Sequence, residues 1–401
     1  MADFHLNYVP TFTALADEDP DAMVEELRQE AARIRIGIII PALYSDLASS
    51  AMAGIIQVLQ RMDFIHKVYI SLDRADESQF YQAQKIVAPL GDKCTLLWND
   101  APRVQEVMQN INEILPLGSR GKGRAVWTAL GYAIAKKEVS VLAFHDADIL
   151  TYNAAFLVRL LFPVVVLKYQ FSKAMYARYS DKLHGRVVRL FYFPFVRSLR
   201  MILGNIDFLD YMADFRYPLS GEFATYTSLA QEMRYPSDWG IEVGILSEIY
   251  RLVRVNRICQ VEITSRYDHK HQEVGATNDE GLRKMVSDIA RTFFSQLSSN
   301  GHILTDNFIR TLKHTYINNA RNFAGVYAGY AEMNQLSKFD LHKEISLIET
   351  FAETFEDAFV RYQEHLSGSP LMPYWRRVEF ALDGVMDQLV QTLENPIDYE
   401  E

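Results

Sequence analysis

The chain has 401 residues, 49% of them apolar and 23% charged, which is the make-up of an ordinary globular protein with two or three domains' worth of length. Its formal net charge is -10, whereas proteins that bind DNA or RNA usually carry an excess of basic residues, so we expect no nucleic-acid partner. The only cysteines, Cys94 and Cys259, lie in apolar runs, which excludes a disulfide framework and favours a reducing cytoplasm. The first residues, MADFHLNYVP, lack the pattern of a secretion signal.

The segment 17–21 is acidic and the helical pattern over 23–33 is rich in charged residues, so residues 1–33 are predicted to form an N-terminal helical arm. A run of β-branched residues over 34–40, closed by Pro41, is typical of a strand buried on both faces of a parallel sheet. Helical and strand patterns then alternate along the chain. The predicted elements are a helix over 45–62, a strand over 65–72, a helix over 78–88, a strand over 94–98, a helix over 123–137 and a strand over 139–144.

Two apolar segments raise the question of a membrane. Residues 156–169 are interrupted by charged residues and a proline and are too short to cross a bilayer of about 30 Å, so we predict a helix end followed by a buried strand. Residues 187–203 interleave arginines with aromatic residues. That pattern suits a membrane surface or a helix packed over an anion-binding cleft. We favour the cleft and expect no membrane partner.

The alternation predicts an open, doubly wound, mostly parallel α/β sheet, in which ligands bind beyond the carboxyl ends of the strands. We assign residues 34–278 to this catalytic domain. Beyond it the strand signals fade, and residues 343–365 carry an apolar stripe at helical spacing. Residues 279–401 are therefore predicted to form an appended C-terminal helical domain.

Asp146-Ala147-Asp148 directly follows the predicted strand over 139–144. Two carboxylates at i and i+2 on a strand end suit a hard cation such as Mg²⁺ or Mn²⁺. The spacing alone is weak evidence, because Asp17 and Asp19 share it in the acidic leader. The alternative is a carboxylate pair that caps the next helix.

Gly121-Lys122-Gly123 opens the helix predicted over 123–137. Glycines let a backbone approach a phosphate, a helix N-terminus offers free N–H groups, and the lysine adds a positive charge. The spacing is not that of a P-loop. The alternative is a basic turn.

Three further segments combine polar residues with turns. His269 and His271 follow a strand-like run over 261–264, and a neutral imidazole there would complete a metal site begun by carboxylates. Either histidine suits that role, and the alternative is a hydrogen-bonded loop residue. The segments PLSGE at 218–222 and SDWGIE at 237–242 offer small polar residues and carboxylates for sugar hydroxyls, although each alone is also typical of a structural turn.

Eight short motifs occur in a fixed order: PALY at 41–44, SLD at 71–73, GKG at 121–123, DAD at 146–148, GRV at 185–187, PLSGE at 218–222, GIE at 240–242 and His269. As a set they resemble the glucosyl-3-phosphoglycerate synthase family of retaining glycosyltransferases. The mannosylglycerate synthases, which share the SDWGI segment, are more distantly similar. The resemblance spans roughly residues 34–280.

The resemblance implies a GT-A fold, a nucleotide diphosphate sugar donor and a divalent metal, Mg²⁺ or Mn²⁺, held by Asp148 and His269. It implies catalytic roles for Glu242, Lys122 and Asp148. The donor would contact Pro41, Ala42, Leu43, Tyr44, Asp73, Gly121, Lys122, Asp146, Ala147 and Glu222. The acceptor would contact Gly185, Arg186, Leu219, Ser220 and Gly221, with Arg186 at its acidic end.

When the bond between the anomeric carbon and the phosphate breaks, negative charge develops on the departing diphosphate. The metal and Lys122 would stabilise that charge. No residue in these motifs is an evident nucleophile, so we expect front-face attack by the acceptor. A leaving phosphate oxygen would accept the proton of the acceptor, and Glu242 would orient the reacting groups.

Two departures from the family pattern bear on the substrates. The family usually has acidic residues just after PAL, where this chain has Tyr44 and Ser45, so UDP and GDP both stay open as donor nucleotides. The family also tends to follow GRV with a threonine, where this chain has Val188. The expected acceptor is 3-phosphoglycerate, with glycerate as the alternative.

Other functional classes fit less well. An aspartyl-phosphate phosphatase would place its aspartates after the first strand, and a nucleotidyltransferase would need a glycine-rich loop there. A catalytically silent sugar-nucleotide-binding protein is the alternative from another class. We also expect a homodimer.

Overall fold

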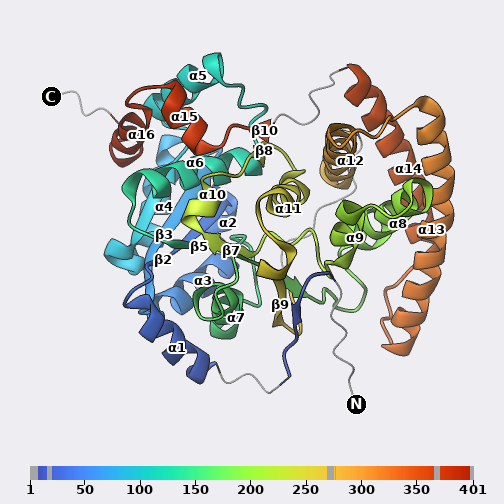
Figure 1. Cartoon of the computed structure of the whole chain (residues 1–401). Helices are drawn as coiled ribbons and strands as arrows, with labels where there is room; N and C mark the ends of the chain where they lie inside the picture. Colours follow the sequence, from blue (N-terminus) through green and yellow to red (C-terminus); the bar gives the residue numbers. More distant parts are fainter. Residues whose placement is uncertain (1–7, 16–19, 269–274, 276, 365–370, 398–401) are drawn as a thin grey trace.

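The computed structural model describes residues 8–15, 20–268, 275, 277–364 and 371–397. Its centre is an eight-stranded sheet with the strand order β1-β9-β6-β7-β5-β2-β3-β4 (Figure 1). Neighbouring strands are parallel, except that β7 runs antiparallel to β5 and to β6. The strands are β1 (Thr11–Phe12), β2 (Ile36–Leu43), β3 (Ile65–Asp73), β4 (Cys94–Trp98), β5 (Val141–Phe144), β6 (Phe171–Tyr176), β7 (Phe223–Tyr226) and β9 (Ile258–Thr264). The mostly parallel sheet predicted from the sequence is confirmed.

The register brings the polar motifs to one edge of the sheet. Ile39 of β2 lies between Tyr69 of β3 and Phe144 of β5 and is fully buried, which explains why β-branched residues dominate this strand. Because β2, β3 and β5 are parallel, their carboxyl ends meet at the same edge. The antiparallel strand β7 begins at that edge, so the 218–222 segment before it lies there too.

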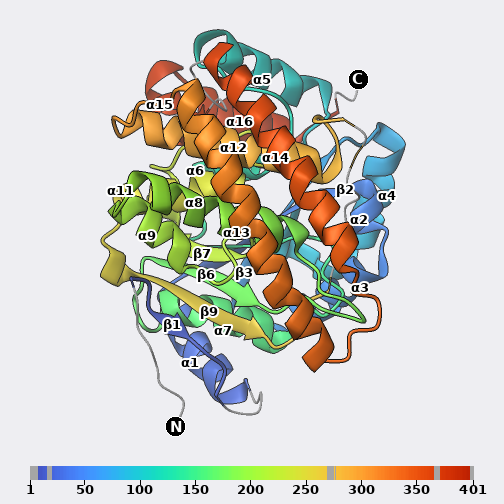
Figure 2. The same cartoon turned by 90° about the vertical axis from the view of Figure 1, so that its right-hand side faces the viewer.

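Helices cover both faces of the sheet (Figures 1 and 2). The predicted helix over 45–62 is two helices, because the Ser49 hydroxyl oxygen accepts a hydrogen bond from the Met52 N–H at 3.4 Å and begins a new helix. The helices up to residue 252, apart from α8, are α1 (Asp21–Ala31), α2 (Tyr44–Leu47), α3 (Ser50–Arg61), α4 (Glu77–Val87), α5 (Pro102–Ile114), α6 (Lys122–Lys136), α7 (Ala154–Val165), α9 (Asp207–Asp214), α10 (Thr227–Ala230) and α11 (Ile241–Leu252).

The buried strand predicted within 156–169 is wrong. Helix α7 continues to Val165 with Pro163 inside it, and the strand β6 begins only at Phe171. The apolar residues of α7 are buried against the sheet, and periodicity cannot separate a short apolar strand from a helix that is buried on most sides.

The C-terminal helices form the second half of the molecule, which Figure 2 shows from the front. They pack on the segment 187–203, in which every residue of the π-helical turn η2 is buried. Phe195 of the following helix contacts Phe293 and Phe355, so the apolar face of this segment packs inside the protein. The elements are η2 (Val187–Tyr192), α8 (Phe193–Leu203), α12 (Gly281–Ser299), α13 (Asp306–Met333) and α14 (Leu341–Glu364).

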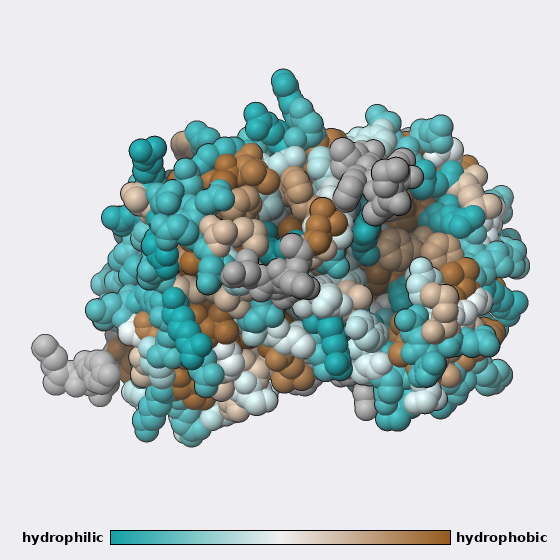
Figure 3. All heavy atoms as spheres, turned by 90° about the horizontal axis from the view of Figure 1, so that it is seen from below, coloured by the Kyte–Doolittle hydropathy of each residue, from teal (hydrophilic) through white to brown (hydrophobic). Residues whose placement is uncertain are grey.

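Among the described residues, no helix combines the length and the apolar character needed to cross a membrane. The face seen from below is mostly hydrophilic, with hydrophobic residues between the polar ones (Figure 3).

The last described residues return to the sheet half. Strand β10 (Leu371–Met372) pairs with β8 (Tyr235–Pro236), and helices α15 (Trp375–Ala381) and α16 (Val385–Glu394) lie beside α5 and α6 (Figure 1). Trp375 stacks on Trp127 of α6 with ring centroids 3.9 Å apart. One hydrophobic cluster runs through both halves. The boundary between residues 278 and 279 stays a prediction, and the helical region does not stand apart from the sheet.

Candidate active site

A cavity of about 800 Å³ opens at the carboxyl edge of the sheet. Its walls come from the ends of β2, β3 and β5, from the start of α6, and from the loop that leads into η2. Helices α12 and α14 close the opposite side. The cavity therefore lies between the two halves of the molecule, and residues far apart in the sequence face one another across it.

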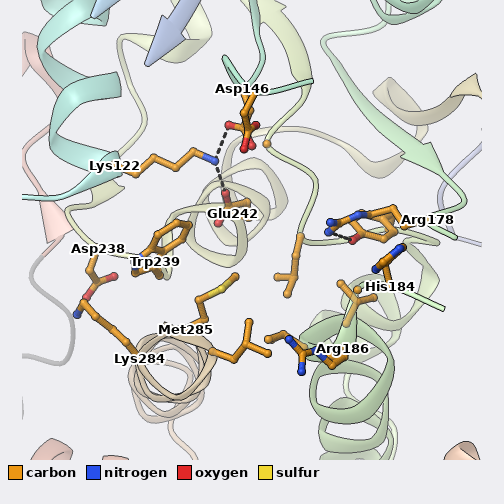
Figure 4. Close-up of a pocket in the computed structure, with 18 of the residues that line it drawn as sticks. Lys122, Asp146, Arg178, His184, Arg186, Asp238, Trp239, Glu242, Lys284 and Met285 are labelled. Carbon is orange, nitrogen blue, oxygen red and sulfur yellow. Dashed lines mark hydrogen bonds and ion pairs between the residues drawn. The ribbon is translucent and has the colours of Figure 1, made fainter. Parts of the chain in front are cut away.

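Lys122 is the centre of the polar side of this cavity. Its Nζ lies 2.7 Å from Asp146 Oδ1 and 3.1 Å from Glu242 Oε1 (Figure 4). Burial disfavours the charged amine, but the two carboxylates outweigh it and raise the pKa of Lys122 above its ordinary value. The ion pairs of Lys122 thus join the GKG, DAD and GIE motifs.

Two glycines allow these motifs to approach so closely. A Cβ on Gly123 would lie 1.9 Å from the Pro236 carbonyl oxygen, and a Cβ on Gly221 would lie 2.7 Å from Asp146 Oδ1. Gly123 has no room for a side chain, and a side chain at Gly221 would displace the Asp146 carboxylate. The sequence predicted that the GKG glycines admit a phosphate, and the structure shows that Gly123 admits the backbone before the SDWGI segment.

Asp73 lies at the end of β3 and lines the cavity, as does Arg120. The Arg120 guanidinium lies 2.7 Å from Asp73 Oδ1 and 2.6 Å from Asp100 Oδ1. The aspartate predicted to hold the nucleotide is therefore shared with an arginine that sequence reasoning missed. A signal was present, because Arg120 directly precedes the GKG motif.

The PALY segment at the end of β2 differs in part from the prediction. Pro41, Ala42 and Leu43 line the cavity, but Tyr44 does not, because its hydroxyl donates a hydrogen bond to Gln82 of α4. Asp46 lines the cavity instead. An acidic residue thus lines the cavity three positions beyond Leu43.

The PLSGE segment is divided between the cavity and the interior. Leu219 and Gly221 line the cavity, as Ala147 does from the DAD motif, whereas Ser220 and Glu222 are fully buried and do not. The two oxygens of Glu222 accept hydrogen bonds from Tyr176 at 2.8 Å and Tyr267 at 2.7 Å. Burial, together with the nearby charge of Asp146, raises the pKa of Glu222. Glu222 was expected to face a sugar hydroxyl, and in this structure its carboxylate lies behind the cavity wall and accepts from two tyrosines.

Ser220 is held in the same interior. Its hydroxyl donates to the Ala174 carbonyl at 2.9 Å, and its own carbonyl accepts from Lys173 Nζ at 2.5 Å. Burial lowers the pKa of Lys173 to about 8. The expected contact of Ser220 with the acceptor is thus replaced by contacts that shape the loop behind Gly221.

The side of the cavity opposite Lys122 is basic. Arg178, His184 and Arg186 gather there (Figure 4), and Gly185 between the last two has a φ of +68° that favours glycine. Arg178 Nη1 donates to the Tyr217 hydroxyl at 3.1 Å. Gly185 and Arg186 were predicted here. Arg178 was not, because no strand was predicted over 171–176 to place it at the sheet edge.

The metal site is described only in part. Asp146 and Asp148 line the cavity, whereas His269 and His271 lie outside the described residues. Within the described ranges no three His, Cys, Asp or Glu side chains cluster as a metal site. A Mg²⁺ ion at a diphosphate commonly takes only one or two carboxylates, with phosphate oxygens and water completing its shell, so the donors present fit such an ion.

The wall formed by α12 and α14 was not foreseen. Leu282 and Met285 of α12 and Leu347 of α14 line the cavity beside Trp239 of the SDWGI segment. The backbone N–H of Trp239 donates to Asp288 Oδ2 of α12 at 3.3 Å, which joins that segment to the helix. The C-terminal helices therefore complete the site.

The fold and the site together define a glycosyltransferase of the GT-A type. Solved structures with this fold include a glucosyl-3-phosphoglycerate synthase from Mycobacterium tuberculosis in complex with Mn²⁺, UDP-glucose and phosphoglyceric acid (TM-score 0.53, 19% identity, 74% of this chain and 90% of that chain). A mannosyl-3-phosphoglycerate synthase from Rubrobacter xylanophilus also shares it (TM-score 0.54, 19% identity, 74% and 83%). At these identities the likeness concerns the fold alone.

Sequence comparison specifies the family. Glucosyl-3-phosphoglycerate synthases from Persephonella marina and Methanococcoides burtonii are 40% and 33% identical to this chain, covering 98% and 97% of it and 98% and 96% of their own lengths. No family model matches the sequence. The chain belongs to the glucosyl-3-phosphoglycerate synthase family.

Proposed function

We propose that this glycosyltransferase moves glucose from a nucleotide diphosphate donor, UDP- or GDP-glucose, to 3-phosphoglycerate with Mg²⁺ or Mn²⁺. One observation carries the proposal. A cavity with a lysine between two carboxylates on one side and a basic loop on the other can hold a donor diphosphate and an acidic acceptor at once. The full-length similarity to glucosyl-3-phosphoglycerate synthases supports the same substrates.

The donor is assigned to the sheet edge. Asp46 and Asp73 supply acceptors for ribose and base groups, and Lys122 lies where the diphosphate would meet the N-terminus of α6. A divalent cation on Asp148 and His269 would supply Lewis-acid stabilisation of the departing diphosphate. Lys122 adds a charge that needs no reorganisation, because Asp146 and Glu242 already hold it in place.

We infer a retaining transfer with front-face attack. Glu242 is the carboxylate beside Lys122, and it is 7% exposed at the cavity surface. It is suited to orient an acceptor hydroxyl, while a leaving phosphate oxygen takes the proton from that hydroxyl. Glu222 has no direct part, because Tyr176 and Tyr267 occupy its oxygens.

The acceptor is assigned to the basic side. Arg186 and Arg178 can each grip a carboxylate or a phosphate with two parallel hydrogen bonds, and 3-phosphoglycerate carries one of each. Val188 packs with Met175 and Tyr217 and offers no hydroxyl, which favours glycerate as the second candidate. Because Arg178 adds a second cation to this side of the cavity, we prefer 3-phosphoglycerate to glycerate as the acceptor.

A matrix of assays tests these assignments. UDP- and GDP-glucose, and the corresponding mannose donors, are each incubated with 3-phosphoglycerate or glycerate and Mn²⁺, and the products are separated by mass spectrometry. We expect a glucosylated phosphoglycerate with the anomeric configuration of the donor. Transfer to neither acid, with tight nucleotide binding, would favour a catalytically silent sugar-nucleotide-binding protein.

We also propose a homodimer in the cytoplasm. Light scattering of the purified protein at several concentrations measures the first, and fractionation of the source cells the second. A monomer at all concentrations, or recovery of the protein outside the cytoplasm, would contradict these proposals.

A further inference from the structure

A buried ion pair joins the loop on the basic side of the cavity to the C-terminal helices. Arg189 of η2 and Glu344 of α14 are each 8% exposed. Arg189 Nη1 lies 2.6 Å from Glu344 Oε2, and Nη2 lies 2.9 Å from Oε1, so the two groups meet in a two-pronged contact. The guanidinium also lies 4.8 Å from the ring centroid of Tyr327 of α13.

The same arginine holds the loop over 183–186. Its Nε donates to the His184 carbonyl at 2.8 Å, and its Nη2 donates to the Leu183 carbonyl at 3.2 Å. Its backbone N–H donates to the Gly185 carbonyl at 2.9 Å. Three successive carbonyls of a loop that lines the cavity are therefore bound by one residue that is not part of the lining.

The other partner belongs to a helix that forms the facing wall. Glu344 itself lines the cavity, as Lys343 and Leu347 of α14 do. A second link lies close by, because the Lys338 N–H donates to the Asp181 carbonyl at 3.0 Å and Lys338 Nζ lies 2.6 Å from Asp181 Oδ2. The chain just before η2 is thus bound to the C-terminal region at two points.

We propose that Arg189 and Glu344 are positioning residues through which the C-terminal helices set the affinity for the acceptor. The inference rests on the proposed function, since it takes the loop over 183–186 as part of the acceptor pocket. A buried ion pair adds little net stability compared with apolar side chains of similar size. Its specific effect here is geometric, because only a guanidinium can bind a carboxylate with two nitrogens and still donate to adjacent carbonyls.

The test removes both charges together, because a buried charge left without its partner is strongly destabilising. The double variant Arg189→Met with Glu344→Met keeps side chains of similar length. Its matched control is Lys313→Met with Glu356→Met, since that pair joins α13 to α14 at 2.5 Å and does not line the cavity.

We expect the double variant to fold and to raise the KM for 3-phosphoglycerate by about tenfold to a hundredfold, the loss that ångström-scale misplacement produces. The donor KM and the control variant should change little. Arg189→Lys should keep the protein folded through its charge and still show the raised acceptor KM. Equal changes in donor and acceptor KM, or no change in either, would overturn the proposal.

A second measurement does not depend on catalysis. Hydrogen exchange of the amides over 180–189 should be faster in the double variant than in wild type and in the control, with the remaining protection unchanged. If the wild-type protein transfers sugar to no acid, the proposed function fails, and exchange at this loop still decides the positioning role. Unchanged protection there would refute it.

Discussion

The backbone N–H of Leu150 donates to the carbonyl of Asp268 at 2.9 Å. The Thr151 hydroxyl oxygen adds a second contact by accepting from the Asp268 N–H at 3.2 Å, across 117 positions of sequence. These bonds hold the segment just after Asp148 against the residue just before His269. The last described residue before His269 is therefore held by the residues two and three positions beyond Asp148, which lines the cavity.

The first prediction concerns this metal. Turnover should be lost in excess EDTA and restored by Mn²⁺ or Mg²⁺, because two carboxylates and a histidine act on a diphosphate only through a cation. Asp148→Asn and His269→Ala should each raise the Mn²⁺ concentration needed for half-maximal rate. His271→Ala is the control, and a shift in that variant instead would reassign the ligand. Full turnover in EDTA would exclude the metal.

Lys122→Ala should lower kcat by about 10²–10³, the typical loss when one preorganised stabiliser of developing charge is removed. The loss should be in kcat, because the diphosphate gains most of its charge as the bond breaks. Lys136→Ala is a matched control at the other end of α6, where the lysine pairs with Glu394 away from the cavity. If kcat of the Lys122 variant falls by less than about threefold, the lysine has only a structural role.

Arg186→Ala should raise the acceptor KM by about tenfold or more with little change in the donor KM, since a charge-assisted hydrogen bond contributes about 1.5–3 kcal/mol. Arg200→Ala on α8 is the control, because Arg200 pairs with Asp210 and does not line the cavity. The assay varies 3-phosphoglycerate and the donor separately. Parallel increases in both constants would show that Arg186 supports the whole site and not the acceptor alone.

The pH dependence of stability should report on Asp288, which is 2% exposed on α12. Burial, followed by the charge of Asp238, raises the pKa of Asp288 to about 6, against the opposing charges of Lys284 and Arg291. Between its unfolded pKa and about pH 6 the folded carboxyl keeps a proton that the unfolded chain has lost. The stability this gives is complete below the unfolded pKa and is lost as pH rises through 6.

Asp288→Asn should remove that dependence. The difference in unfolding free energy between variant and wild type should shift in favour of the variant by at most about 1.4 kcal/mol per pH unit over that range. Urea unfolding at pH 4.5 and 6.5 measures it. A difference that is constant, or that moves the other way, would show that Asp288 titrates normally.

Much of the donor side followed from local patterns. Strand β2 was predicted from its run of isoleucines and Asp146 from its place after a buried strand, and parallel strands bring such ends to one edge whatever the rest of the chain does. The GKG motif was predicted at a helix start, and α6 begins at Lys122. These features depend on a few neighbouring residues and on strand direction, so a single sequence suffices for them.

The remaining features depend on contacts with residues that are distant in the sequence, which a local pattern cannot predict. The patterns around Glu222 and Glu242 look alike, yet Glu222 turns to Tyr176 and Tyr267 inside the protein, while Glu242 meets Lys122 at the cavity. Tyr44 likewise turns to α4 and leaves the cavity to Asp46.

The amino-acid sequence was enough for the fold class, the family and the order of the motifs, since these follow from periodicity and from short segments along the chain. The tertiary structure alone decided which motif carboxylate is buried and which is accessible. It also decided that α12 and α14 wall the cavity, and that Arg189 ties its loop to Glu344, 155 positions away. The physical reason is that burial and ion pairing are set by packing between distant elements, which no local pattern records.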